Sequence, residues 1–196
     1  VGMDWRNLQK ARMALFAELI SRVPQASMGR TMLMKLCYFL QEVRGVPLGY
    51  RFTIYSYGPF DSEVLSDLNT AVGLDGVKST VVYNSAGYGY RLEPGPMSAA
   101  IRDDGEWFLR QHQDSIDWAV EEFGDKAASE MELESTMVFV DREAAGRGEI
   151  LSLDLLTDRA RNLKPHFQRE HIAARAKDLY SRRLLKSVKR EAALSA

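Results

Sequence analysis

The chain has 196 residues, of which 45% are apolar and 27% are charged, and its formal net charge is −1. These proportions are typical of a soluble globular protein with a packed core, and they exclude a largely disordered chain. No window holds about 18 consecutive apolar residues, and the first residues lack a basic region followed by an apolar stretch. The sequence therefore predicts a cytoplasmic protein without a membrane span or a signal peptide, and its single cysteine, Cys37, fits a reducing compartment.

Charge is unevenly distributed along the chain. Residues 147–196 hold 12 basic and 6 acidic residues, whereas residues 93–143 hold 14 acidic and 4 basic ones. An acidic middle and a basic end can attract each other within one chain or between two copies, so a homodimer is one expectation. The alternative is two helix faces whose charges are simply solvated.

The first half of the chain predicts a small α+β domain. Apolar residues recur at helical spacing in three segments, and aromatic and β-branched residues concentrate in three others. Gly58-Pro59 ends the first strand, and the turn-rich segment 84–87 separates the other two. In chain order we expect helices at 4–21 and 31–43, a strand at 50–57, a helix at 61–72, and hairpin strands at 77–83 and 88–92. This order is typical of a winged helix-turn-helix, in which the hairpin is the wing.

The second half predicts helices only. The segment Glu93–Pro96 combines two prolines with a glycine and is the best internal boundary. After it, apolar spacing predicts helices at 98–111, 116–123, 127–145, 153–163 and 167–188. The predicted fold is mostly α with a small β-hairpin (α+β). A winged-helix-like domain at residues 1–95 would be followed by an all-helical extension at residues 96–196 that packs on it.

We find no motif for catalysis, for a cofactor or for a metal. Of the three histidines, His166 and His171 are five residues apart, which does not place them on one helical face for metal chelation. Cys37 lies on an apolar helical stripe, where a thiol is usually a small buried residue. Neither a nucleophile elbow nor a phosphate-binding glycine loop occurs, and neighbouring carboxylates on a helix point apart. We therefore expect a protein that is not an enzyme and has no cofactor.

The third predicted helix is acidic and carries no Lys or Arg. A winged helix that reads DNA usually places this helix in the major groove, where carboxylates would be repelled by phosphates. The acidic helix instead favours a protein partner, and the aromatic residues before it are typical of binding surfaces. The predicted protein-binding residues are Tyr55, Tyr57, Phe60, Asp61, Glu63 and Asp67.

The basic end of the chain is the alternative binding surface. Its Lys and Arg residues could contact phosphates, or they could face water or the acidic middle as part of an ordinary amphipathic helix. A nucleic-acid-binding transcriptional regulator is thus the alternative to a protein-binding regulator. The nucleic-acid-binding candidates are Arg175, Lys177, Arg182, Arg183, Lys186, Lys189 and Arg190.

Residues 32–68 carry the most specific pattern of the chain. Lys35-Leu36 and Tyr38 lie on the second predicted helix, Tyr57-Gly58-Pro59 follow on the strand, and the third helix is entered through 61–65. This pattern resembles the YwgA-like family and, more broadly, the Panacea group, which includes the SocA-like antitoxins and proteolytic adaptors. Two later stretches, at residues 89–92 and at 133–141 followed by 163–165, also resemble the YwgA-like pattern.

The resemblance implies a regulatory or adaptor protein that binds another protein, with a toxin as one candidate partner. Panacea antitoxins usually follow Gly-Pro with a small aliphatic residue and a second proline, whereas this chain has Phe60-Asp61, which favours the YwgA-like branch. We assign architectural roles to four motif residues. Lys35 can lay its methylenes along the buried helix beside Tyr38 while its ammonium reaches a carbonyl. Gly58 permits a turn that other residues resist, and Pro59 fixes the dihedral at the start of the third helix.

Overall fold

A computed structural model describes residues 4–84 and 87–188 of the chain. Helices account for most of these residues, and the strands form two two-stranded sheets, so the mostly-α fold with a small β-hairpin is confirmed. The assignment to the winged helix-turn-helix class remains a prediction. No described helix is both long enough and apolar enough to cross a membrane.

The described residues form two compact units. Unit 1 holds residues 4–53 and 60–131, and unit 2 holds residues 54–59 and 132–188. The division expected at residue 95 does not coincide with this one but falls inside unit 1. The physical reason is that the helices just after residue 95 pack on the first helix of the chain.

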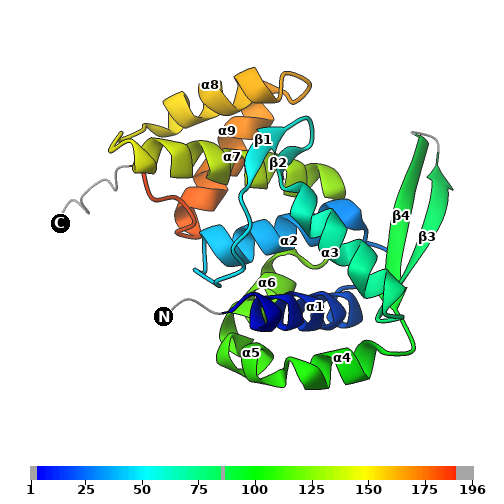
Figure 1. The fold of residues 1–196 in the computed structure, drawn as a ribbon. Coiled ribbons are helices and arrows are strands. Elements are labelled where there is room, and N and C mark those ends of the chain that lie inside the picture. Colours follow the sequence, from blue (N-terminus) through cyan, green and yellow to red (C-terminus); the bar gives the residue numbers. More distant parts are fainter. Residues whose placement is uncertain (1–3, 85–86, 189–196) are drawn as a thin grey trace. The chain divides into compact units, whose positions relative to one another are not determined.

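Unit 1 is built around its first helix, α1. Its elements are α1 (Trp5–Arg22), α2 (Arg30–Glu42), α3 (Ser62–Gly73), β3 (Val77–Asn84), β4 (Gly87–Pro94), α4 (Ser98–Asp104), α5 (Glu106–Gln111) and α6 (Gln113–Phe123). α1 contacts α3, α4 and α5, while α2 contacts α6 (Figure 1). The rings of Phe39 and Phe123 stack in the core with centroids 4.1 Å apart, and both are fully buried.

The helix expected over 98–111 is two helices. A Cβ added at Gly105 would lie only 2.3 Å from the Cβ of Ala14, so α1 approaches the chain where only glycine fits. Gly105 follows α4 and precedes α5. The expectation of one helix is wrong because a local apolar pattern does not report this long-range contact, while glycine itself weakens a helix.

β4 is attached to the segment before α2. The Leu92 N–H donates to the Met28 carbonyl at 3.0 Å, and a Cβ at Gly29 would lie 2.7 Å from the Tyr90 carbonyl oxygen. The Arg30 guanidinium carbon lies 3.3 Å from the centroid of the Tyr90 ring. The base of the β3–β4 hairpin is therefore fixed, whereas its outer half projects away from the helices of unit 1 (Figure 1).

Unit 2 contains the middle of a second hairpin, α7 (Ala128–Gly146) from Glu132 onward, and the helices α8 (Leu153–Leu163) and α9 (Arg169–Ser181). In the hairpin, β1 (Thr53–Tyr55) pairs with β2 (Gly58–Phe60). α8 packs on α9, and Leu151 forms a parallel bridge with Val188. α7 is buried at nearly every position from Met131 to Asp141, so its polar side chains must find partners inside the protein.

The strand expected over 50–57 is instead a tight hairpin, β1–β2. Gly58 has a φ of 89°, which lets the chain reverse direction there, and Pro59 lies inside β2. The role expected for Pro59 at the start of the third helix is therefore wrong. α3 begins at Ser62, and Asp61 caps it by accepting a hydrogen bond from the Glu63 N–H.

The last helix is shorter than expected. The pattern predicts a helix over 167–188, but α9 ends at Ser181. Arg183 has a φ of 61°, which is incompatible with a continuing α-helix, and the N–H of Leu184 returns to the carbonyl of Leu179. Basic residues from Arg182 onward therefore do not lie on one helical face with those of α9.

Candidate functional site

The β1–β2 turn displays two tyrosines. Tyr55 is 67% exposed and Tyr57 is 70% exposed, whereas the next two residues, Gly58 and Pro59, are buried. Tyrosine suits protein interfaces because its ring offers a large apolar area and its hydroxyl stays compatible with water. Both rings were predicted as binding residues, and the structure places both at the surface. Phe60, the third aromatic candidate, is half-buried.

Lys164 fixes the backbone between these two tyrosines. Its ammonium donates to the carbonyl of Ser56 and, at 2.7 Å, to Oε1 of Glu132 on α7. Lys164 is 1% exposed, and His166 Nε2 lies 3.5 Å from the same carboxylate oxygen. A buried ammonium is tolerated only when charge and hydrogen bonds compensate for its lost hydration. This arrangement therefore holds the turn in one position.

Gly58 lies directly against α7. A Cβ added there would meet Thr136 Oγ1 at 3.0 Å, Ser135 Oγ at 3.1 Å and the Glu132 carbonyl oxygen at 3.3 Å. The two hydroxyls donate to that same carbonyl, at 2.7 Å from Thr136 and 3.2 Å from Ser135, so they are held in place. The hairpin approaches α7 this closely only because residue 58 has no side chain. Gly58 and Lys164 together form the seat of the β1–β2 turn.

Asp67, predicted to lie on an acidic binding surface, is buried in unit 1. Its Oδ2 accepts hydrogen bonds from Arg12 Nη1 at 3.1 Å and from the Tyr50 hydroxyl at 2.8 Å. Arg12 is itself buried, and its Nε donates to the Leu48 carbonyl at 2.8 Å. The expectation of a partner-binding Asp67 is therefore corrected: the residue ties α3 to α1 and to the segment before β1.

The other two acidic candidates of this region also have partners within unit 1. Glu63 is half exposed, and its carboxylate is paired with Arg12. Asp61 accepts the Glu63 N–H at 2.9 Å and, through its second oxygen, the Arg51 N–H. The acidic surface that α3 offers to a partner is thus smaller than the sequence indicates. The exposed tyrosines of the β1–β2 turn are therefore a better candidate for a protein-binding surface than the acidic residues of α3.

Burial affects the pKa values of the hydrogen-bonded groups around Arg12, which are Asp67 and Tyr50. Burial raises the pKa of Asp67 above its ordinary value, although the Tyr50 hydrogen bond and the Arg12 charge oppose this rise. Burial alone would lower the pKa of Arg12, but the Glu63 hydrogen bond and the charges of Tyr50, Asp67 and Glu63 together outweigh it, so the pKa is raised. Burial also raises the pKa of the Tyr50 phenol and of the Cys37 thiol. Cys37 is fully buried, as its apolar stripe predicts, and its thiol stays protonated.

Two of the basic candidates turn inward rather than outward. Arg175 Nη1 lies 3.3 Å and Arg182 Nη2 lies 2.9 Å from the carboxylate of Glu134, which is fully buried. The expectation that these two arginines contact nucleic acid is corrected, because a buried carboxylate needs compensating cations. Three candidates are exposed, and two lie outside the described residues. The exposed ones are Lys177, Arg183 and Lys186, and those outside are Lys189 and Arg190.

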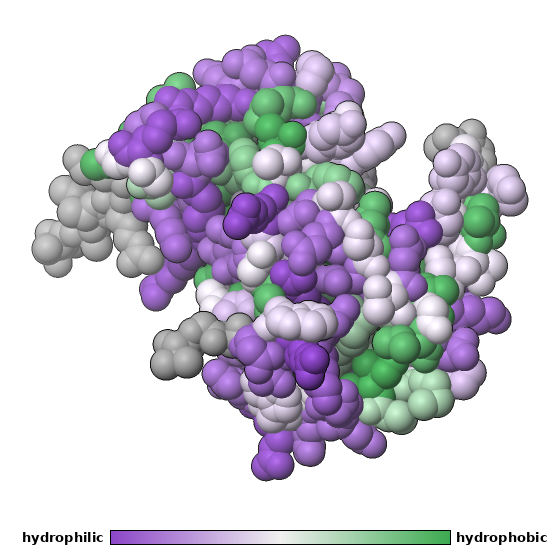
Figure 2. Space-filling view, viewed as in Figure 1, coloured by the Kyte–Doolittle hydropathy of each residue, from purple (hydrophilic) through white to green (hydrophobic). Residues whose placement is uncertain are grey.

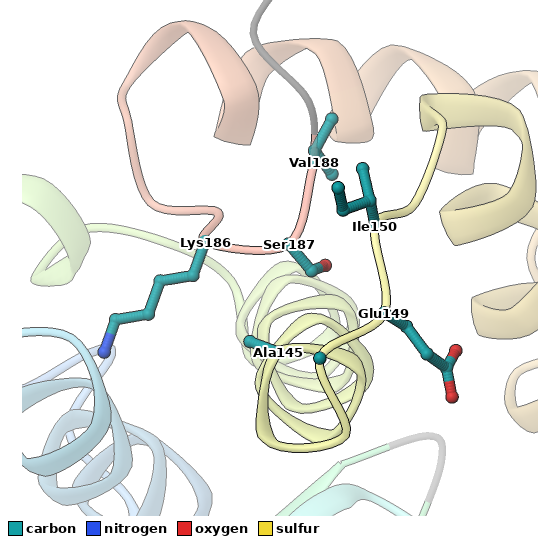
Figure 3. A pocket seen from close by; sticks show the side chains of 7 residues that line it. Ala145, Glu149, Ile150, Lys186, Ser187 and Val188 are labelled. Atoms are coloured by element: carbon teal, nitrogen blue, oxygen red, sulfur yellow. The ribbon is translucent and has the colours of Figure 1, made fainter.

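A pocket of about 340 Å³ in unit 2 does not bring catalytic groups together. The side chains of Lys186 and Glu149 point away from each other across it (Figure 3). The Ser187 hydroxyl donates to Asp141 at 2.6 Å. Within residues 4–84 and 87–188, no group of three or more His, Cys, Asp or Glu is placed to hold a metal.

An apolar groove of about 490 Å³ lies between α1, α3 and α4 in unit 1. Leu74 and Met97 line it and are about half exposed, and the Lys10–Asp104 ion pair, at 2.9 Å, borders it. Figure 2 shows hydrophobic surface at the ends of α3 and α4. The lining is suited to contact with apolar groups rather than to acid–base chemistry.

Motif residues Lys35 and Tyr38 lie inside the protein, at 2% and 1% exposure. The Tyr38 ring meets the Phe52 ring edge-on, with centroids 5.1 Å apart. The sequence pattern does not assign a role to Lys164, although residues 163–165 belong to a stretch that resembles the YwgA-like pattern. A lysine after an amphipathic helix carries no local sign that its ammonium is buried, because the carbonyl that it binds is 108 residues away.

Comparison with known proteins adds no relative. No family model matches the chain, and neither a curated protein nor a solved structure matches it. The resemblance of residues 32–68 to the YwgA-like family therefore remains an expectation from the sequence.

Proposed function

We propose that this chain is a non-enzymatic regulatory or adaptor protein that binds another protein through its β1–β2 turn. Tyr55 and Tyr57 would be the principal contacts. The observation that best supports this proposal is the combination of two exposed rings with a backbone fixed between them by Lys164 and Gly58. Buried groups are used to position a turn whose side chains face solvent.

A fixed turn favours binding because less conformational entropy is lost when a partner orders it. Tyrosine has only two side-chain dihedrals, so its ring adds contact area at low entropic cost. A few such aromatic residues often supply most of the binding free energy of an interface. The chemistry of the rings fits a partner surface of aliphatic or cationic side chains. A toxin is one such partner by the sequence resemblance, but the proposal requires only a protein.

The test is quantitative capture of the partner from cells of the source organism, using the full chain as bait. The variant Tyr55→Ala/Tyr57→Ala is compared with Trp5→Ala/Trp107→Ala, a control that removes two exposed aromatic rings from α1 and α5. We expect a stoichiometric protein partner with the native chain and with the control. The turn variant should weaken its affinity by about 30-fold or more, as loss of an interface hot spot does.

Thermal unfolding of both variants establishes that they remain folded. Capture of the same partner by the turn variant and by the native chain, with equal affinity, would contradict the proposed site. Failure to capture any stoichiometric protein in repeated experiments would contradict the protein-binding function itself.

A further inference from the structure

The outer edge of β3 is open. Within the described residues this sheet has only the strands β3 and β4, and their antiparallel register pairs Ser79 with Leu92, Val81 with Tyr90 and Tyr83 with Tyr88. The Leu92 N–H points away from β3, because it donates to the Met28 carbonyl. Backbone groups of an antiparallel strand alternate in direction. Leu92, Tyr90 and Tyr88 therefore face away from β3 with their backbone groups. Ser79, Val81 and Tyr83, which lie opposite them, point their N–H and C=O groups away from β4.

The same hairpin carries apolar side chains at the surface. Val81 is 44% exposed, Tyr83 is 84% exposed and Tyr88 is 67% exposed. Their register places all three on one face of the hairpin, together with Tyr90, whose ring meets that of Tyr88 edge-on at 6.0 Å. Open edges are usually blunted by proline, by charges or by a covering segment. Between Ser79 and Tyr83 the strand contains neither proline nor charge.

We propose that β3 pairs antiparallel with β3 of a second copy of this chain, about a two-fold axis at Val81. Val81 would face Val81 of the second copy, and Ser79 would face Tyr83. These are the positions whose backbone groups point outward, so the register makes about six hydrogen bonds between the copies. It also extends the exposed apolar face across four strands, which stabilises a hairpin that is marginal alone.

Charge selects a second copy in this antiparallel arrangement. The only charged residue of β3 is Lys78, at its beginning, and within its own hairpin it lies opposite Glu93. Antiparallel pairing places the two Lys78 side chains at opposite ends of the joined strands, whereas parallel pairing in register would place them side by side. The edge is therefore complementary to itself, as a two-fold interface requires. This interface is separate from the β1–β2 turn and does not depend on the function proposed for it.

The test is the mass of the full chain by sedimentation equilibrium over a range of concentrations. We expect a monomer–dimer equilibrium in the native protein. Val81→Lys and Val81→Glu each place like charges opposite each other at the axis, so each should raise the dimer dissociation constant about tenfold or more. An equimolar mixture of the two variants should regain native dimerisation, because Lys then faces Glu. Misfolded variants could not produce this rescue.

The matched control is Thr80→Glu, one residue away on the opposite face of the hairpin, where the new carboxylate lies opposite Arg91 of its own chain. It should dimerise like the native protein. A monomeric mass at every concentration would overturn the proposal, as would native dimerisation of both Val81 variants or failure of their mixture to dimerise. Since the readout is mass, its failure and a failure of partner capture are distinguishable.

Discussion

At the scale of single residues, two glycines allow the effect of a positive φ to be distinguished from the effect of close packing. Gly58 and Gly45 both have positive φ, at 89° and 69°. A Cβ at Gly58 would press on α7, whereas a Cβ at Gly45 would meet nothing within 4 Å. The two positions share the conformational requirement, but only one also requires the absence of a side chain.

We expect Gly58→Ala to lower the free energy of unfolding by about 2–4 kcal/mol, since it combines an unfavourable φ with a close contact to α7. Gly45→Ala should lower it by about 1–2 kcal/mol from the φ alone. Urea denaturation of the two variants provides the measurement. Equal losses would show that the contact between the hairpin and α7 is not tight.

The burial of Asp67 agrees with its position on the helix and disagrees with its charge. The buried residues of α3 are Val64, Asp67, Leu68 and Ala71, which follow the spacing of one helical face. The apolar periodicity therefore places Asp67 on the buried face, although a carboxylate usually lies in solvent. Its partner Arg12 is 55 residues earlier in the chain, and no local pattern connects the two.

At the scale of elements, the sequence predicts most of the helices well and the hairpin around Gly58 poorly. Apolar spacing placed α1, α2, α3 and α8 within one or two residues of their observed ends. The β1–β2 turn was missed because its two strands have three residues each, too few for a strand pattern. Its position depends on Lys164, whose partners lie far away in the sequence.

Replacing Lys164 by Met tests whether the turn depends on that lysine. The substitution keeps an apolar stem but removes the ammonium, which leaves the Glu132 carboxylate buried without its cation. We expect a loss of about 3–5 kcal/mol in the free energy of unfolding, measured by urea denaturation. The double variant Lys164→Met/Glu132→Gln should recover part of this loss, because no buried charge remains. A single variant as stable as the native protein would contradict the proposed seat of the turn.

At the scale of the whole molecule, charge does not act as the sequence suggested. The sequence predicts a phosphate-binding surface at the basic end, but Arg175 and Arg182 neutralise Glu134 instead. The boundary expected at residue 95 likewise ignored the packing of later helices on α1. Both differences arise because a linear pattern shows which residues are charged or apolar, but not which distant residues they meet.

Duplex DNA binding provides the corresponding test. With two candidate arginines paired internally and a net charge of −1, we expect no measurable binding at about 150 mM salt. Fluorescence anisotropy at low and at moderate salt would measure it. Submicromolar, salt-sensitive binding that the double variant Lys177→Glu/Arg183→Glu abolishes would contradict this expectation and restore the nucleic-acid alternative.

The contacts of Gly58 and Lys164 also limit how early the β1–β2 turn can fold during translation. Ser56 leaves the ribosome 108 residues before Lys164, whose ammonium binds its carbonyl. At common rates of synthesis this interval is roughly 5–20 s. During the first part of that interval, until α7 has been made, Gly58 also lacks its contact with α7, and until Lys164 has been made Tyr55 and Tyr57 lie on a turn that is not yet fixed. A nascent chain should therefore acquire its fixed tyrosine turn only after α7 and α8 have been made.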